Sequence, residues 1–472
     1  MGTGDFQKSP VPIPGKCVMI MIMLISGGEN VDNRKIVLPD KVKRIILNLQ
    51  SHGYEAYAVG GCVRDSLLGR TPEDWDITTS ATPFQVKAIF PKTFDTGIEH
   101  GTVTVLMEKE GFEVTTYRID GEYEDARHPK EVTFTASLTE DLRRRDFTIN
   151  AMAYNDAEGL IDVFGGLADL QNKMIRCVGN ARERFSEDAL RILRGIRFAA
   201  QLGFEIDEET RNGMRTLAPT LKKISAERIQ VELVKLLTSD RPDMLREAYQ
   251  LGITRQFLPE FDLLMQTEQE TPHHMYNVGE HTLHAMTNIR ANKILRLTML
   301  MHDMGKPALK TMDETGRAHF KKHALESEKI AKEIMTKLKF DNDTKHKVSR
   351  LVLYHDYRMP ATDRAVRRAM NRIGEDLFPF YLEVRRADVL AQSTYKREEK
   401  IENLDQIEKL HGQIKEAGQC VSLKGLAVTG KDLIEAGMQP GKEIGEKLNE
   451  LLELVIECPE YNTKEELLKH LG

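Results

Sequence analysis

Cysteines are scarce in this sequence. The 472 residues include five cysteines, and no two of them form a C-x-x-C pair; they stand at positions 17, 62, 177, 420 and 458. This spacing excludes a disulfide framework and the usual cysteine zinc sites. It indicates free thiols in a reducing compartment, and we therefore predict a cytoplasmic protein.

Long apolar runs are also scarce. The single long one, Cys17–Ile25, is far shorter than the roughly 20 residues that a membrane helix needs, so we expect no membrane partner. Lys16 precedes it, which leaves a weak signal peptide as one alternative. Three methionines within the run leave a mis-assigned start as another. We predict that residues 1–37 form a disordered extension and that ordered sequence begins near Leu38, with an amphipathic helix from Val42 to Leu49.

A strong excess of charge is absent as well. The formal net charge is −6, with 30% charged and 40% hydrophobic residues. These values are ordinary for a chain that forms a hydrophobic core. A nucleic-acid surface would therefore have to be local. The length predicts about three domains.

Two glycines stand between a short apolar strand and a helix. Gly60 and Gly61 follow Tyr57–Val59 and precede a helical pattern that contains Arg64. Without a Cβ atom, glycine lets the backbone approach a ligand closely. The start of a helix directs free N–H groups at anions, and an arginine adds a charge-assisted contact. The run predicts a phosphate cradle.

Two carboxylates follow at alternate positions. On a strand, Asp74 and Asp76 would point to one face. Paired carboxylates suit Mg²⁺, which supports nucleotidyl transfer by activating a hydroxyl and stabilising pyrophosphate. A lone pair of this kind is more often a solvated strand end, and a lone Gly-Gly is usually a turn. Their order within one short run favours the catalytic interpretation.

This run resembles a known signature. Residues 60–76 match every specified position of the first motif, G-G-x-V-R-D-x-L-L-G-R-x-x-x-D-x-D, of the class II tRNA nucleotidyltransferase and bacterial poly(A) polymerase family. The resemblance covers about residues 40–472. It implies an α+β fold, with a polymerase-beta-like nucleotidyltransferase head built on a small mixed or antiparallel sheet. An all-α neck, body and tail would follow.

The head continues with a predicted hairpin. Thr102–Met107 and Glu113–Arg118 alternate like strands, and the charged turn Glu108–Gly111 separates them. Glu113 opens the second strand. The resemblance implies that it is a third carboxylate near the metal, while an exposed strand-end glutamate is the alternative.

A polar segment follows the hairpin. Residues 120–127 contain a glycine and predict a mobile loop. They resemble the flexible loop that CCA-adding enzymes need for the final adenosine and that enzymes adding only the two cytidines lack. The loop residues would be Asp120, Asp125 and Arg127.

An arginine triplet follows the loop. By itself, the run beginning at Arg143 would be a solvated face. It leads into a predicted helix at Asn150–Tyr154 and resembles the family motif R-R-D-F-T-x-N. The resemblance places Arg145 and Asp146 beside the ribose and triphosphate and makes Asn150 a nucleotide-binding residue.

The neck begins with a predicted helix over Phe185–Phe198. Ser186 is the expected N-cap, and Asp188 and Arg191 are three residues apart, so they would share one face. A carboxylate beside a guanidinium can hydrogen-bond the edge of a base. A surface ion pair is the alternative.

The same segment resembles the family motif E-D-x-x-R. In CCA-adding enzymes this motif selects CTP and then ATP without a nucleic-acid template, and Arg194 would also bind the nucleotide. The next helix, Ser225–Leu237, resembles a neck helix that gives structural support.

A second metal site is predicted further along. His281, the pair His302 and Asp303, and Asp388 occur in the order of the HD phosphohydrolase pattern, which they resemble. Histidine mixed with carboxylate favours Mn, Fe, Co, Ni or Zn. Such a metal activates water for phosphoester hydrolysis. His323 and His355 could complete a second metal position. The resemblance suggests phosphatase or 2′,3′-cyclic phosphodiesterase action on damaged RNA ends.

One predicted helix carries a row of basic residues. Four arginines recur at helical spacing and would form one basic face for RNA phosphates, namely Arg364, Arg367, Arg368 and Arg372. The alternative is a solvated face balanced by nearby acids. From Val428 onward, glycine turns and an amphipathic helix resemble the family's tail.

Together these features predict a CCA-adding nucleotidyltransferase that uses tRNA, CTP, ATP and Mg²⁺, with no evident protein partner. The expected parts are an extension (1–37), head (38–175), neck (176–270), HD domain (271–400) and tail (401–472). A poly(A) polymerase is the nearest rival. The others are a hydrolase whose head binds RNA and a non-catalytic RNA-binding protein.

Overall fold

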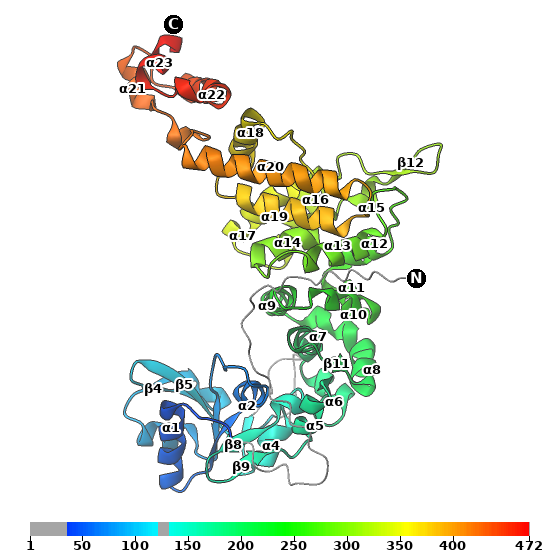
Figure 1. Ribbon diagram of the computed structural model, residues 1–472. Coiled ribbons are helices and arrows are strands. Elements are labelled where there is room, and N and C mark those ends of the chain that lie inside the picture. Colours follow the sequence, from blue (N-terminus) through cyan, green and yellow to red (C-terminus); the bar gives the residue numbers. More distant parts are fainter. Residues whose placement is uncertain (1–34, 121–131, 472) are drawn as a thin grey trace, which may run out of the picture.

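The computed structural model describes residues 35–120 and 132–471. Residues 1–34 of the predicted extension and 121–127 of the predicted loop lie outside these residues, while Ile36, which the prediction assigns to the extension, is buried in the core. A head, neck, body and tail follow one another along an elongated molecule, with the head at one end and the tail at the other (Figure 1). Among the described residues, no helix has the length and apolar character to cross a membrane.

The head is built on a seven-stranded sheet in the order β3-β4-β5-β2-β1-β8-β9. Strands β2 and β5 run parallel, and the other neighbours run antiparallel. The head strands are β1 (Ala56–Val59), β2 (Ile77–Thr79), β3 (Thr93–Gly97), β4 (Thr102–Met107), β5 (Glu110–Thr116), β6 (Arg118–Asp120), β7 (Val132–Phe134), β8 (Ala153–Asn155), β9 (Gly159–Ile161) and β10 (Met174–Ile175). The head helices are α1 (Asp40–Ser51), α2 (Gly61–Leu67), α3 (Pro83–Ile89), α4 (Leu138–Arg143) and α5 (Gly166–Gln171).

Two local predictions for the head are confirmed. Helix α1 buries Val42, Ile45, Ile46 and Leu49, which are the periodic apolar positions. Strands β4 and β5 form the predicted hairpin. Its turn is shorter than expected, since Glu108 and Lys109 take left-handed φ angles of 52° and 74° and β5 already begins at Glu110. Two left-handed residues match the twist of the flanking strands.

Two other head predictions are wrong. The expected helix Asn150–Tyr154 is instead a 3₁₀ turn (Thr148–Asn150) followed by strand β8. Tyr154 lies opposite Ala58 of β1, so pairing within the sheet overrides the local helical preference. Asp74 and Asp76 also precede β2 rather than lying on it.

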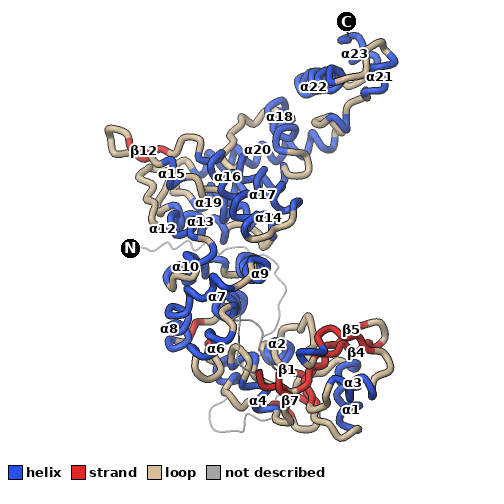
Figure 2. The backbone as a smooth tube through the Cα atoms, turned by 180° about the vertical axis from the view of Figure 1, so that it is seen from behind, coloured by secondary structure: helices blue, strands red, loops and turns tan. Residues whose placement is uncertain are grey.

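The neck is a group of short helices that packs on the head (Figure 2). Its elements are α6 (Ala181–Glu187), α7 (Leu190–Leu202), β11 (Glu205–Ile206), α8 (Glu208–Leu217), α9 (Ala226–Leu237), α10 (Leu245–Gln250), α11 (Thr254–Phe257) and α12 (Pro259–Met265). The expected single helix over Phe185–Phe198 is wrong. Ser186 lies inside α6, whose N-cap is Asn180. Helix α6 ends at Glu187, and the extended backbone of Asp188 separates it from α7.

The body is helical. Its elements are α13 (Val278–Thr287), α14 (Lys293–Met301), α15 (Lys306–Leu309), β12 (Thr311–Met312), β13 (Ala318–His319), α16 (His323–Lys337), α17 (Asn342–Tyr354), α18 (Asp363–Ile373), α19 (Phe378–Ala391) and α20 (Arg397–Glu416). Helix α20 buries Leu404, Ile407 and Ile414 in one cluster with residues of α18 and α19. The expected boundary at residue 400 therefore falls inside a body helix.

The tail has its own small core. Its helices are α21 (Gly430–Glu435), α22 (Lys442–Glu457) and α23 (Lys464–Leu468). Leu433, Leu451 and Leu467 are fully buried together. The predicted amphipathic helix at Leu448–Ile456 is confirmed as part of α22.

Candidate active sites in the head and body

The glycine run forms a tight turn between β1 and α2. Gly60 has a φ of 83°, and a Cβ atom there would lie 2.9 Å from Arg145 Nη1. The positive φ favours glycine, and any larger residue would also require the end of the Arg145 side chain to move. Arg64 Nη1 donates to Asn150 Oδ1 at 2.7 Å, which joins the cradle to the second head motif.

Three carboxylates come together where β2 begins, next to the interior strand β5. Ile77 of β2 lies opposite Val114 of the parallel strand β5. Asp76 is the residue just before β2, and Glu113 is the residue before Val114 on β5, so this pairing places Asp76 beside Glu113. Burial raises the pKa of Glu113, and the charges of Asp76 and Asp74 raise it further. Burial also raises the pKa of Asp76, with Arg145 opposing and Asp74 adding to the shift. Carboxylates that repel one another in this way fit a bound divalent cation.

A cavity of about 580 Å³ opens next to these carboxylates. Asp74, Asp76 and Arg64 line its head side, while Arg197 and Lys235 line its neck side. The head and neck therefore enclose the candidate site together. Arg197 is fixed by a 2.5 Å hydrogen bond from its Nε to Glu232 Oε2 on α9.

Asp146 connects the head to the neck. Its Oδ2 accepts a 2.7 Å hydrogen bond from Arg194 Nε on α7, and its Oδ1 accepts from Asn150 Nδ2 at 3.1 Å. Burial alone would raise the pKa of Asp146, but Arg194 and Asn150 together lower it to about 2. The carboxylate is thus held ionised and oriented.

The base-reading pair of the sequence prediction does not form an i,i+3 ion pair. Asp188 accepts from Arg228 of α9, with Oδ2 2.6 Å from Nη2. Arg191 Nη1 donates instead to Glu187 Oε2 at 2.5 Å. Asp188 sits at the break between α6 and α7, where its Oδ1 also accepts from the Leu190 N–H.

Sequence reasoning missed two residues here. Arg228 lies on the helix to which only structural support was assigned. Phe198 is covered by the guanidinium groups of Arg64, Arg194 and Arg197, at 5.1, 5.3 and 3.9 Å from the ring centroid. The sequence shows these arginines, but it does not show that all three lie against the Phe198 ring, because only folding brings Arg64 of the head next to α7.

The body brings the predicted HD residues together. His281 Nε2 lies 3.0 Å from Asp388 Oδ1 and 3.3 Å from His302 Nε2, and His302 Nε2 lies 3.1 Å from Asp303 Oδ2. His323 and His355 approach the other oxygen of Asp303, at 3.3 and 3.5 Å. Two overlapping groups could hold a metal ion, one made of His281, His302 and Asp303 and the other of Asp303, His323 and His355. We call these six residues the His/Asp cluster.

The surroundings of the Asp303 carboxylate show whether this cluster suits a cation. Both carboxylate oxygens are buried and accept no hydrogen bond of ordinary geometry, although Lys306 Nζ lies 2.7 Å from Oδ2. Burial acts to raise the pKa of Asp303, but His302 and Lys306 hold it well below its ordinary value. An ionised, buried carboxylate with imidazoles beside both of its oxygens is a suitable metal ligand.

The predicted basic face of α18 has other partners. Arg367 is buried and donates to the Ile456 and Glu457 carbonyls at the end of α22. Arg364 and Arg368 pair with the Glu457 carboxylate. Arg372 lies over the Tyr357 ring at 5.5 Å. This favours the alternative of a face balanced by acids, because arginine satisfies the free carbonyls at a helix end. These contacts attach the tail to the body.

Three family models match successive parts of the chain. They are the poly A polymerase head domain at residues 56–176, the probable RNA and SrmB-binding site of polymerase A at 203–265, and tRNA nucleotidyltransferase domain 2 at 319–471. The CCA-adding enzyme of Levilactobacillus brevis is 38% identical over 417 residues, which cover 87% of this chain and 92% of that relative. The chain belongs to the class II tRNA nucleotidyltransferase and poly(A) polymerase family.

Other relatives of this family agree. The CCA-adding enzyme of Enterococcus faecalis is 53% identical over 203 residues, and this match spans 42% of the chain and half of that relative's length. The crystal structure of the Bacillus stearothermophilus CCA-adding enzyme in complex with CTP is 32% identical, with a TM-score of 0.65 and coverage of 91% of this chain and 95% of that one. The Thermotoga maritima CCA-adding enzyme complexed with tRNA, at 21% identity, covers 93% of this chain and 96% of that one with a TM-score of 0.56, and shows a shared fold. The α+β prediction is confirmed, and family membership implies a divalent metal.

Proposed function

We propose that this protein adds CCA to the 3′ end of tRNA without a nucleic-acid template, using CTP and ATP. The observation that carries the proposal is the meeting of Asp74, Asp76 and Glu113 beside the Gly60 cradle. The relatives at 38% and 32% identity, both CCA-adding enzymes, support the same activity.

Different residues would bind the triphosphate, the ribose and the base. Gly60, Gly61 and Arg64 would bind the triphosphate through backbone N–H groups and a guanidinium. Arg145 and Asp146 would contact the ribose, with Asn150 orienting both Arg64 and Asp146. Asp188 and Arg191 would hydrogen-bond the base, with Arg228 and Glu187 fixing their directions.

Asp74, Asp76 and Glu113 would hold Mg²⁺. Bound there, Mg²⁺ supplies activation of the 3′-hydroxyl and stabilisation of the leaving pyrophosphate. The tRNA 3′-oxygen forms a bond to the α-phosphorus of CTP or ATP, and the bond to pyrophosphate breaks. The segment 120–127 would act in the final adenosine addition, with Asp120, Asp125 and Arg127 as its polar residues.

The direct test uses tRNA that ends at the discriminator base and tRNA that ends in CC. Each is incubated with CTP and ATP, and the 3′ ends are sequenced. We expect both to end in CCA. Repeated A addition would instead indicate a poly(A) polymerase, and an end at CC would indicate a CC-adding enzyme.

We propose a second activity for the body, metal-dependent hydrolysis of phosphoesters. The observation that carries this proposal is the buried Asp303 carboxylate, whose two oxygens lie between two groups of His and Asp ligands that could each hold a metal ion. A transition metal such as Mn, Fe, Co, Ni or Zn suits the His/Asp cluster, and it supplies an activated water. His281, His302, Asp303 and Asp388 would hold one ion, and His323 and His355 would complete a second position. Damaged RNA ends that carry a 2′-phosphate or a 2′,3′-cyclic phosphate are the expected substrates.

This second activity can be separated from the first. Asp76→Ala should abolish CMP and AMP incorporation and leave phosphatase activity intact. Asp303→Asn should do the reverse and also remove the bound transition metal, measured by elemental analysis. If Asp303→Asn retains the full metal content of the unchanged protein, the cluster assignment is wrong.

A further inference from the structure

A cavity of about 340 Å³ lies on the outer side of the His/Asp cluster. His323 of the cluster lines it, so the cavity reaches the candidate metal ligands. Its described lining includes one carboxylate, Asp356, against several cations. We call four of these cations the cationic collar; they are Arg317, Lys321, Arg358 and Lys400.

Lys400 Nζ lies 3.5 Å from the imidazole Nδ1 of His273. Burial lowers the pKa of His273, and the charges of Lys400, Arg317 and Arg358 lower it further. These cations come from the segment before β13, the segment after α17 and helix α20, so folding assembles them. Burial also lowers the pKa of Lys400, and Arg358 adds to that shift although Asp388 opposes it. Cations that crowd together create a positive field that a bound anion relieves.

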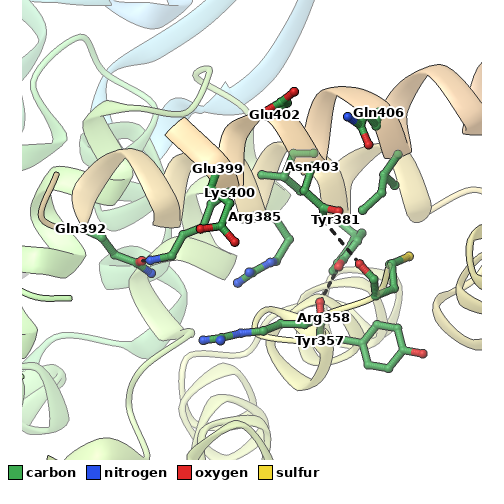
Figure 3. Close-up of a pocket in the computed structure, with 13 residues that line it drawn as sticks. Tyr357, Arg358, Tyr381, Arg385, Gln392, Glu399, Lys400, Glu402, Asn403 and Gln406 are labelled. Atoms are coloured by element: carbon green, nitrogen blue, oxygen red, sulfur yellow. Dashed lines mark hydrogen bonds between the residues drawn. The ribbon is translucent and has the colours of Figure 1, made fainter. Parts of the chain in front are cut away.

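A short chain of hydrogen bonds joins the collar to the cluster. Lys400 Nζ donates to Gln392 Oε1 at 2.6 Å, and Gln392 Nε2 donates to Asp388 Oδ2 at 3.1 Å. The ammonium therefore stands two hydrogen bonds from a cluster carboxylate. In Figure 3, Arg358, Arg385 and Lys400 extend toward the side of the pocket where Gln392 lies.

The cavity adjoins a second one. Arg358, Gln392 and Lys400 also line a neighbouring space of about 410 Å³, together with two carboxylates, Glu399 and Glu402. Volumes of this order suit a small ligand, and a base or two of an unpaired strand can enter where a duplex cannot.

We propose that the cationic collar binds the phosphodiester adjacent to a terminal phosphate held at the His/Asp cluster. The ligand class is thus a single-stranded ribonucleotide end that carries two successive phosphates. The inference rests on the proposed hydrolase function for the role of the terminal phosphate. Binding by the collar itself requires no metal.

The test is calorimetric titration of the full chain in the presence of a chelator. The probes are the dinucleotide ApAp, which ends in a 3′-phosphate, and the mononucleotide Ap, which lacks the second phosphate. We expect ApAp to bind about tenfold more tightly than Ap, as one additional charge-assisted contact predicts. Lys400→Met and Arg358→Gln should each remove most of this preference, while Lys400→Arg should keep it. Lys409→Met, an exposed substitution on the same helix, is the matched control. Binding to the head is common to every variant and cancels in the comparison.

A site-specific readout accompanies the titration. ApAp should slow the acetylation of Lys400, measured by mass spectrometry, and should leave Lys409 unaffected. Equal affinity for ApAp and Ap, or a Lys400→Met variant that retains the preference, overturns the proposal. Adenosine 3′,5′-bisphosphate serves as a third probe. If it binds as tightly as ApAp, the natural ligand is a free nucleotide with two phosphates. If it binds more weakly, the ligand is the end of a strand. If ApAp binds through Lys400 but the purified protein contains no transition metal, the binding role of the collar is supported and the proposed hydrolase function is contradicted.

Discussion

Asp146 of the head and Arg194 of the neck are joined by a 2.7 Å hydrogen bond from Arg194 Nε to Asp146 Oδ2. Asp146 is buried, and its other oxygen accepts from the Phe147 N–H and from Asn150. Arg194 also lies over Phe198. One ion pair thus links the proposed ribose contact to the helix that carries Arg191.

Arg194→Met should destabilise the fold by about 2 kcal/mol at neutral pH, because it leaves the buried Asp146 carboxylate without its charged partner. The pKa of Asp146 is lowered to about 2 in the folded protein. The ionised Asp146 carboxylate therefore contributes to the free energy of unfolding above the ordinary aspartate pKa. This contribution is lost as the pH falls toward 2. Urea unfolding should show the difference between wild type and variant shrinking over that interval. Arg182→Met, on the exposed face of α6, is the control. A difference that stays constant with pH would contradict the assignment.

The three head carboxylates predict a metal-dependent stability. The raised pKa values of Asp76 and Glu113 mean that the folded state disfavours their ionised forms. Metal-free protein should therefore lose stability as pH rises from the ordinary carboxyl pKa through the raised values. Mg²⁺ should restore it, measured as a rise in Tm at pH 7.

Asp76→Asn should remove most of that Mg²⁺-dependent rise and lower nucleotide incorporation by at least about 100-fold. The metal-free variant should be no less stable than wild type, because the substitution removes a repulsive charge. Glu73→Gln, a substitution in the same segment that lines the same cavity, should change neither property. A full Mg²⁺ response in Asp76→Asn would contradict the proposed metal site.

Arg228→Met should impair the choice of nucleotide. Without the 2.6 Å contact from Arg228, the Asp188 carboxylate is no longer fixed at the break between α6 and α7. We expect kcat/KM for CTP relative to UTP to fall about tenfold, with about 1 kcal/mol lost in stability. Single-nucleotide incorporation assays measure this ratio. Arg215→Met on α8 should preserve it, and an unchanged ratio in Arg228→Met would show that Asp188 is oriented by other contacts.

Arg367→Met should loosen the tail. The buried Arg367 guanidinium donates hydrogen bonds to the last carbonyls of α22, and the substitution removes them. We therefore expect α22 to lose about 2 kcal/mol of local stability. Hydrogen exchange over residues 442–457 should accelerate, while exchange in the head stays constant. Arg372→Met is the matched control, because Arg372 is exposed on the same helix. Equal protection of α22 in both variants would contradict this role for Arg367.

The amino-acid sequence by itself determined the features that depend on local pattern. The spacing of Val42, Ile45, Ile46 and Leu49 predicted α1, and alternation predicted the β4–β5 hairpin. The run from Gly60 to Asp76 indicated the family because it matches every specified position of the family's first motif. The ordered His and Asp residues predicted a cluster in the body.

Only the tertiary structure decided what depends on distant partners. Strand β8 replaced a predicted helix because β1 offers it backbone hydrogen bonds. Asp188 pairs with Arg228, forty residues away along the chain, rather than with its helical neighbour Arg191. The arginines of α18 hold the tail because the end of α22 presents free carbonyls and Glu457 to them. Local periodicity specifies which face of an element is polar, but the partner of a charged side chain is fixed only when packing brings another element within hydrogen-bonding distance.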